Sequence, residues 1–162
     1  MTRAAGKGIR SRCLITNMSP QPVYITSLLG TLHLADRTIE LALTDLRELP
    51  EEELRQDARS QMGQGSLDTG EYLVIGHFEE ITQAMLDAND ETEVVVSDVL
   101  RLDLIAVALV ASEKLPIAAS RSFEFEQRAE QGTKVQPLSI ATRQITKKRE
   151  RRALMKTVEY HT

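Results

Sequence analysis

Apolar and polar residues alternate near the start of the chain in the manner of β-strands. Alternation with a period of two, typical of a strand with one buried face, covers residues 9–16 and 38–44. Residues 23–28 are rich in β-branched and aromatic side chains and follow a turn of Asn, Ser and Pro at residues 17–22. A further short run at residues 32–34 predicts a hairpin with residues 38–44. This density of strands favours a β-rich layered fold.

Three more strands are predicted farther along the chain, at residues 71–76, 93–98 and 120–126. Residues 100–111 fit two patterns. Leu100, Leu102 and Leu104 alternate as in a strand, whereas Leu100, Leu104, Val107 and Ala111 recur at helical spacing. Of the two we favour the strand.

Helical signals occur at three places. The first is at residues 49–62, where Pro50 and three glutamates form a favourable first turn. The second is at residues 79–88, where Ile81, Ala84, Met85 and Ala88 recur at helical spacing before an Asn-Asp break. The third is at residues 141–159, which lack Gly and Pro and are rich in helix formers. We therefore expect two short helices among the strands and one at the C-terminal end.

The turn Asn17-Met18-Ser19, followed by Pro22-Val23-Tyr24-Ile25, resembles the first turn of immunoglobulin-like sandwich domains, over roughly thirty residues. The resemblance implies a sandwich and names no family within that class. Two inserted helices and the absence of Trp depart from the simplest such domain. The expected fold is mainly β: an immunoglobulin-like β-sandwich-type single domain with two short helical insertions and a C-terminal basic helix.

The chain length of 162 residues corresponds to one domain. The patterns divide it into a basic N-terminal arm at residues 1–8, a β-rich domain at residues 9–126, a linker at residues 127–140 and a basic helical tail at residues 141–162. All alternating patterns end by residue 126. We therefore expect residues 9–126 to fold without the tail.

Composition limits the chemistry that the chain can support. Aromatic residues make up 4% and Trp is absent, so the core must consist of Leu, Ile, Val and Ala, and stacking platforms for bases or sugars are not expected. A single cysteine, Cys13, excludes an intramolecular disulfide and a multi-cysteine zinc site. We expect no metal and no cofactor. No export signal is visible, and the most apolar window, residues 102–111, is too short to span a membrane.

Charge is distributed unevenly along the chain. The net charge is −4, but residues 141–162 carry +5, residues 1–12 carry +4 and residues 13–140 carry −13. An acidic body between two basic ends gives information about the partners of the protein and little about its fold. The alternative is that these ends are merely solvated.

Asp68-Thr69-Gly70 resembles the catalytic triplet of aspartic proteases, in which a dimer pairs two carboxylates around one proton. The resemblance implies a dimeric retropepsin-like enzyme. However, Glu71 follows the glycine where those enzymes have a small residue, and residues 64–67 form a poor preceding strand. A glycine turn leading into the strand at residues 71–76 is the preferred interpretation.

Other candidate nucleophiles and acids have simpler explanations. Cys13 lies on the predicted buried face of the strand at residues 9–16, where a thiol behaves as a small hydrophobe. The carboxylate pairs Asp98 with Asp103 and Glu79 with Glu80 show no acid/base or metal spacing and are interpreted as surface charges. No phosphate-binding glycine loop, zinc-protease helix or calcium loop is present.

The C-terminal helix supplies the candidate binding residues, which are Arg143, Lys147, Lys148, Arg149, Arg151, Arg152, Leu154 and Lys156. Its cations can face acidic protein or phosphates, and Leu154 with Val158 is expected to add an apolar anchor. Because the body is acidic, the expected partner is an acidic protein surface or another copy of this chain. Nucleic acid remains possible through the tail, and no membrane partner is expected.

These observations predict a non-enzymatic structural or adaptor subunit of a multi-protein assembly, either cellular or part of a virus or phage particle. Its location would be cytoplasmic or particle-associated. The alternatives are the dimeric aspartic protease and a nucleic-acid-binding accessory protein.

Overall fold

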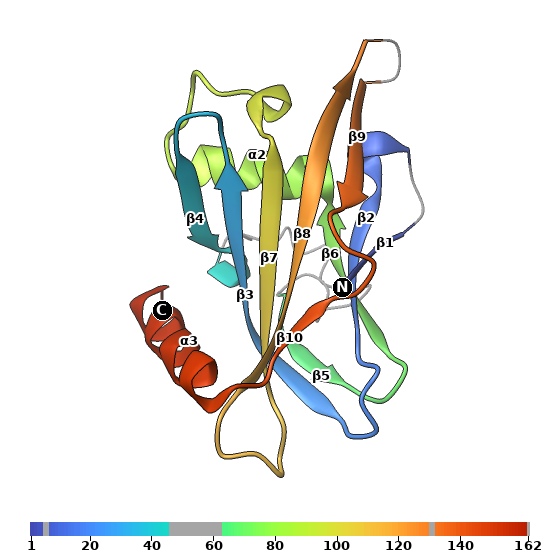
Figure 1. Ribbon diagram of the computed structural model, residues 1–162, viewed down its shortest axis with the longest axis vertical. Coiled ribbons are helices and arrows are strands. Elements are labelled where there is room, and N and C mark those ends of the chain that lie inside the picture. Colours follow the sequence, from blue (N-terminus) through green and yellow to red (C-terminus); the bar gives the residue numbers. More distant parts are fainter. Residues whose placement is uncertain (5–6, 46–62, 130–131, 162) are drawn as a thin grey trace, which may run out of the picture.

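Two antiparallel sheets pack face to face (Figure 1). The computed structural model describes residues 1–4, 7–45, 63–129 and 132–161. The small sheet has the order β1 (Thr2–Ala4), β2 (Arg12–Thr16) and β6 (Tyr72–His77). The large sheet has the order β10 (Arg143–Ile145), β8 (Ile117–Arg128), β7 (Arg101–Leu109), β3 (Val23–His33) and β4 (Thr38–Ala42). Two further strands pair with members of this sheet: β5 (Gly65–Leu67) with β3, and β9 (Gly132–Pro137) with β8. The expected mainly β, sandwich-like fold with a C-terminal helix is confirmed.

The main core lies between the two sheets. Period-two alternation places Cys13 and Ile15 of β2 on the inner face, together with Leu73 and Ile75 of β6. The large sheet contributes Leu32, Leu102, Leu104 and Phe123, each fully buried. Aliphatic side chains and two phenylalanines of β8 thus fill the core, in which many sandwiches have a buried tryptophan.

Helix α2 (Phe78–Ala88) completes the cover over the inner face of the large sheet. Its apolar side chains Phe78, Ile81, Met85 and Leu86 join the same core cluster. At its start, the Glu80 carboxylate accepts a hydrogen bond from the His77 backbone at 3.1 Å, which satisfies a free N–H at the helix end. Gly30 of β3 allows the close approach, because a Cβ there would lie 2.8 Å from Met85 Sδ.

Helix α3 (Lys148–His161) packs on the opposite, outer face of the large sheet (Figure 1). A second, smaller cluster joins Leu154 of the helix to Leu29, Ala42, Val107, Ala118 and Ile145 of the sheet. Odd-numbered residues of β7 face this side, whereas Leu102 and Leu104 face the core. The large sheet therefore carries α2 on one face and α3 on the other.

The turn after β2 is built as its resemblance to a sandwich turn implies. Asn17 is buried and donates hydrogen bonds from Nδ2 to the carbonyl oxygens of Gln21 (2.9 Å) and Leu67 (3.0 Å). Its Oδ1 accepts a bond from the Ser19 backbone at 3.0 Å. One asparagine thereby closes the β2–β3 turn and ties it to β5.

Most of the predicted strands are confirmed, including the ambiguous segment at residues 100–111, which forms β7. The hairpin of β3 and β4, the strands at residues 71–76 and 120–126 and the helix at residues 79–88 are also present, some extended at their ends. In the segment at residues 9–16, the first part forms the 3₁₀ helix η1 (Gly8–Arg10) instead of strand. The 3₁₀ helix η2 (Leu43–Asp45) ends the hairpin. The helix predicted at residues 49–62 lies outside the described residues.

The strand predicted at residues 93–98 is wrong. This stretch contains the 3₁₀ helix η4 (Val96–Asp98), in which the Asp98 carboxylate accepts a hydrogen bond from the Val95 backbone at 3.1 Å. Val95 is exposed, so its β-branched side chain gains nothing from a sheet. The aspartate offers the backbone a partner within the turn, and this local bond replaces a strand ladder.

The segments outside residues 9–126 contribute strands that the patterns did not predict. The expected arm at residues 1–8 contains β1, which pairs with β2. The expected linker at residues 127–140 contains β9, which pairs with β8 along six residue positions. The expected tail begins with β10, paired with β8 from Arg143 to Ile145, and turns helical at Lys148. Whether residues 9–126 fold without these segments stays a prediction.

Candidate functional site

The cationic C-terminal helix is fixed to the sheet by one arginine and one leucine. Arg151 donates from Nε to the Pro116 carbonyl at 2.7 Å, and its Nη2 donates to the Leu115 carbonyl and pairs with Glu113 Oε2 at 3.1 Å. The Arg151 side chain is only 13% exposed. One turn later, Leu154 is buried in the outer-face cluster. Both residues were predicted to bind a partner, but within this molecule they hold α3 in place.

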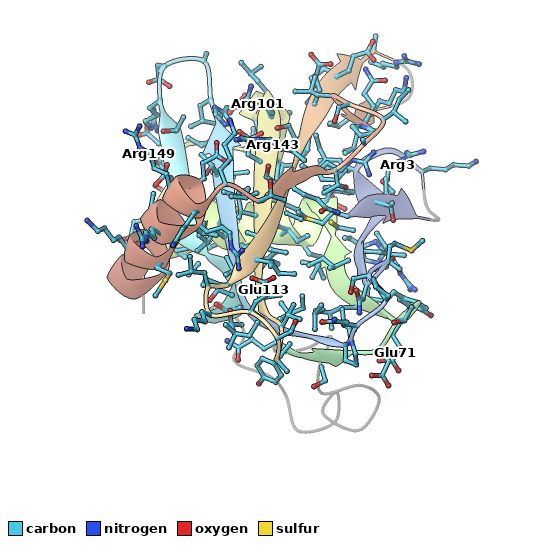
Figure 2. All side chains as sticks on the ribbon, turned by 60° about the horizontal axis from the view of Figure 1, so that its bottom comes forward. Arg3, Glu71, Arg101, Glu113, Arg143 and Arg149 are labelled. Atoms are coloured by element: carbon cyan, nitrogen blue, oxygen red, sulfur yellow. The ribbon has the colours of Figure 1, made fainter. Side chains whose placement is uncertain are left out.

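Arg143 is also engaged within the fold. It lies on β10, opposite Ser120 of β8, and its Nη2 pairs with Glu150 of α3 at 3.0 Å. This exposed pair links the strand to the helix that follows it. Arg143 lies over the sheet and Arg149 lies on the helix (Figure 2). Because Arg151 and Leu154 face the sheet, the eight predicted residues do not all belong to one exposed surface.

Five of the eight predicted residues remain available to a partner. These residues, which we term the cationic surface, are Lys147, Lys148, Arg149, Arg152 and Lys156. All five side chains are exposed, and none has an ion pair with another described residue. Met155, 37% exposed, is an apolar residue between them. Leu154 cannot be the exposed anchor that the sequence suggested, because it faces the sheet.

A complementary acidic segment lies on the other side of the molecule. Residues 78–98 contain seven acids and no Lys or Arg, and the acids are Glu79, Glu80, Asp87, Asp90, Glu91, Glu93 and Asp98. Glu79 pairs with Arg10, and Glu91 pairs with Arg37. Asp90 and Glu93 are exposed and make no ion pair with a described residue. Of these acids, only Glu79, Glu80 and Asp98 were interpreted from the sequence, as surface charges, although the lack of any cation in the run is visible there.

The acidic segment begins with α2, which covers the inner face of the large sheet, whereas α3 lies on the outer face. The sheet and its side chains therefore separate the two charged regions, as Figure 1 shows. Neither region can neutralise the other within one molecule.

A polar cluster occupies the outer face of the large sheet beyond α3. Asp103 Oδ2 lies 2.7 Å from His33 Nε2 and 2.8 Å from Arg101 Nη2, and the two basic side chains are 3.0 Å apart. Burial raises the pKa of Asp103, but hydrogen bonds from Ser122, His33 and Arg101 outweigh burial and lower that pKa overall. Asp103 Oδ2 and Arg101 Nη2 are thus partnered, whereas Asp103 Oδ1 and Arg101 Nε are buried without a hydrogen-bond partner among the described residues, so the cluster is only partly satisfied.

The Asp68-Thr69-Gly70 triplet forms the turn between β5 and β6. The Asp68 backbone donates to Glu71 Oε2 at 3.0 Å, and Thr69 Oγ1 donates to the Ser19 carbonyl at 2.9 Å. Gly70 has φ +84°, a conformation that favours glycine. All three residues are exposed. Turn geometry thus accounts for each residue of the triplet, as the preferred interpretation expects.

Cys13 is fully buried in the main core, as predicted. Burial raises the pKa of its thiol to about 12. The thiolate, the reactive form, is therefore scarce at neutral pH. Within the described residues, no three His, Cys, Asp or Glu side chains are grouped as metal ligands would be.

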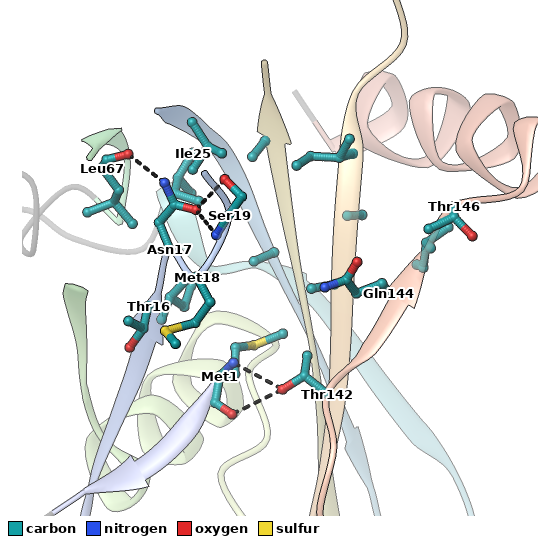
Figure 3. A pocket seen from close by; sticks show the side chains of 18 of the residues that line it. Met1, Thr16, Asn17, Met18, Ser19, Ile25, Leu67, Thr142, Gln144 and Thr146 are labelled. Carbon is teal, nitrogen blue, oxygen red and sulfur yellow. Dashed lines mark hydrogen bonds between the residues drawn. The ribbon is translucent and has the colours of Figure 1, made fainter. Parts of the chain in front are cut away.

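An open cavity of about 520 Å³ lies between the sheets at the end away from α2 (Figure 3). Its walls are mainly apolar and include Ile15, Ile25, Ala106 and Ala108. Asn17, Thr142 and Gln144 bring polar atoms to its rim. No pattern in the sequence predicted this cavity.

Comparisons with known proteins give no relative for this chain. No family model matches it, and neither the curated proteins nor the solved structures contain a significant match. Among the described helices, none is long and apolar enough to cross a membrane. Functional inference therefore rests on the geometry of the surface and the cavity.

Proposed function

We propose that this protein is a non-enzymatic structural or adaptor subunit that associates with acidic protein surfaces, foremost with further copies of itself. The observation that carries the proposal is the placement of two oppositely charged regions, each with side chains that make no ion pair with a described residue, on opposite faces of one sheet. The cationic surface of α3 would contact the acidic segment at residues 78–98 of a neighbouring copy.

The two surfaces differ, so the contact is heterologous. One copy presents α3 while its neighbour presents α2 and the loop that follows, which leaves a free surface of each kind at the ends of a pair. Such a contact either closes into a ring or continues as a chain of subunits. Both outcomes suit a component of a larger assembly.

The strength of this contact can be bounded. Each exposed ion pair contributes at most ~1 kcal/mol, so five pairs give at most ~5 kcal/mol before the cost of association. A dissociation constant near or above ~0.1 mM follows. Met155 adds a small apolar contact. The association should therefore be weak, rapid and sensitive to salt, because screening acts over about 10 Å at 0.1 M.

Charge reversal on α3 tests the proposal. The triple variant Lys148→Glu, Arg149→Glu and Arg152→Glu leaves Arg151 and Leu154 in place, so the helix should stay docked. We expect the wild type to show a mass above that of the monomer by light scattering at low salt and millimolar protein, and the variant to be monomeric.

A matched control changes the same number of charges elsewhere. Arg3→Glu, Lys7→Glu and Arg12→Glu alter exposed cations away from α3 and give the same net charge. The control should self-associate as the wild type does. If both triple variants behave alike, net charge and not the α3 surface governs association. If the wild type stays monomeric but binds a DNA duplex with a steep salt dependence, the nucleic-acid alternative replaces this proposal.

A further inference from the structure

The cavity between the sheets opens where both sheets end. Its lining includes Met1, which precedes β1 of the small sheet, and Thr142, which precedes β10 of the large sheet (Figure 3). Thr142 Oγ1 bridges these two segments, because it accepts a bond from the Met1 nitrogen at 3.1 Å and donates to the Met1 carbonyl at 3.2 Å. A volume of about 520 Å³ is within the range of small-molecule pockets, ~300–1,000 Å³.

The cavity results from a change in side-chain size along two paired strands. The inner-face residues of β7 are Leu102 and Leu104 at the α2 end, then Ala106 and Ala108 at the cavity end. On β8, the inner-face residues that follow Phe123 toward the cavity are Arg121, whose guanidinium bonds to the Met1 carbonyl, and then the small Ala119, which pairs with Ala106. Protein interiors are normally close-packed, so a row of alanines that leaves an apolar space open is an exception that needs an explanation.

Most polar atoms at the rim already have partners. Asn17 uses its amide in the β2–β3 turn, and Arg151 is engaged by carbonyl oxygens and by Glu113. The Gln144 amide is different: it makes no hydrogen bond to a described residue. Gln144 pairs with Ala119 across β10 and β8 and so shares the inner face, and Figure 3 shows its amide directed into the cavity.

We propose that this cavity binds a small neutral amphiphile: a molecule with an aliphatic or aromatic body and one uncharged hydroxyl or carbonyl group. The apolar body would occupy the space beside Ala106, Ala108 and Ile25. The polar group would bond to the Gln144 amide, which both donates and accepts. The cations of the lining are already engaged, Arg151 by the Pro116 carbonyl and Glu113, and the Met1 amine by Thr142 Oγ1, while burial lowers the pKa of that amine. Because the Glu113 carboxylate also lines the rim, an anionic head group fits less well than an uncharged one.

The direct test is titration of the full chain with 1-octanol, followed by calorimetry and by thermal unfolding. We expect saturable binding and a melting temperature that rises with ligand concentration, because a ligand that binds only the folded state stabilises it. Octanoate, which has the same body and a charged head, should bind at least tenfold more weakly. Equal binding of the two would overturn the assignment of an uncharged head group.

Variants locate the binding. Ala108→Leu and, separately, Ala119→Leu fill the cavity and should abolish octanol binding while the chain stays folded. Ala111→Leu, the same change at an exposed turn position, should leave octanol binding as in the wild type. Gln144→Leu should weaken octanol binding roughly threefold to tenfold, the effect of one lost hydrogen bond.

Two results would overturn the proposal: no saturable octanol binding by the wild type, or undiminished binding in a folded cavity-filling variant. Should one filling variant fail to fold, the other and Gln144→Leu still decide the question. Because the cavity and the cationic surface of α3 are separate, light scattering of Gln144→Leu should match the wild type. Failure of this inference is thus distinguishable from failure of the proposed self-association.

Discussion

At the scale of single residues, Asp103 is the acidic residue of the polar cluster on the outer face of the sheet. Its carboxylate contacts both His33 and Arg101, so its loss would leave two basic groups 3.0 Å apart. We expect Asp103→Asn to lower the free energy of unfolding at pH 7 by about 1.5–3 kcal/mol, measured by urea denaturation. Asp36→Asn, which affects an exposed pair with Arg37, should cost at most ~1 kcal/mol.

The pKa of Asp103 also sets a direction for pH dependence. Because that pKa is lowered in the folded protein, the carboxylate stabilises the fold above its ordinary value of 3.8 and loses this effect as the pH falls through the folded-state value. The stability difference between wild type and Asp103→Asn should therefore shrink below about pH 4. A difference that is unchanged in acid would contradict the role of the charged form.

Cys13 gives a prediction about reactivity. A pKa near 12 and full burial predict that iodoacetamide at pH 8 leaves the native thiol unmodified, while the urea-unfolded chain reacts at the ordinary rate. Mass spectrometry after timed exposure measures this. Rapid modification of the native protein would show that β2 opens readily. This residue was predictable from sequence alone, because alternation with Ile15 indicated a buried face.

At the scale of elements, α3 depends on the contact of Leu154 with the outer face of the sheet. Leu154→Ala should lower the free energy of unfolding by about 2 kcal/mol, near the low end for buried leucines because the helix edge can adjust. Urea unfolding at high salt avoids interference from self-association. Met155→Ala, at the exposed neighbour, should change stability by at most ~0.5 kcal/mol. Equal effects at the two positions would mean that α3 is not docked through Leu154.

Local patterns predicted the elements that have one buried face and missed those defined by distant partners. The alternation of β2, β6 and β7 reflects their burial directly. In contrast, β9 and β10 contain few apolar residues and are strands because β8 extends far enough to pair with both. Val94 to Val96 shows the reverse case: this β-branched run pairs with no strand among the described residues and is not itself a strand. The alternation of apolar and polar residues within a short segment does not show which distant strand the segment will pair with.

At the scale of the whole molecule, the sequence revealed an acidic body and a basic end but not their geometry. That α2 and α3 cover opposite faces of one sheet depends on the tertiary fold. The same holds for the cavity: the change from leucine to alanine along residues 102–108 was visible, but the alignment of Ala106 with Ala119 required the strand register. Both candidate sites thus combine local chemistry with placements that only the fold supplies.

The central claim is that the cationic surface of α3 meets the acidic segment of another copy, and a charge-swap mixture tests it most directly. Besides the α3 triple variant, a second variant carries Asp87→Lys, Asp90→Lys and Glu93→Lys. The α3 variant carries a net charge of −1 on its formerly cationic surface, so both of its surfaces are negative, and the second variant lowers the net charge of residues 78–98 from −7 to −1. The attraction within each sample is thereby removed or greatly reduced, and each variant alone should remain a monomer of about 18 kDa. Mixed in equal amounts, they restore one contact of opposite charge, between the unchanged cationic surface of the second variant and the unchanged acidic segment of the α3 variant.

The measurement is the weight-average mass of the mixture by light scattering, at millimolar protein and about 10 mM salt, where screening extends to about 30 Å. The account predicts a mass above that of the monomer in the mixture, a return to monomer in 0.5 M salt, and monomers in each separate sample. A mixture that stays monomeric while the wild type associates would contradict the pairing of these two surfaces.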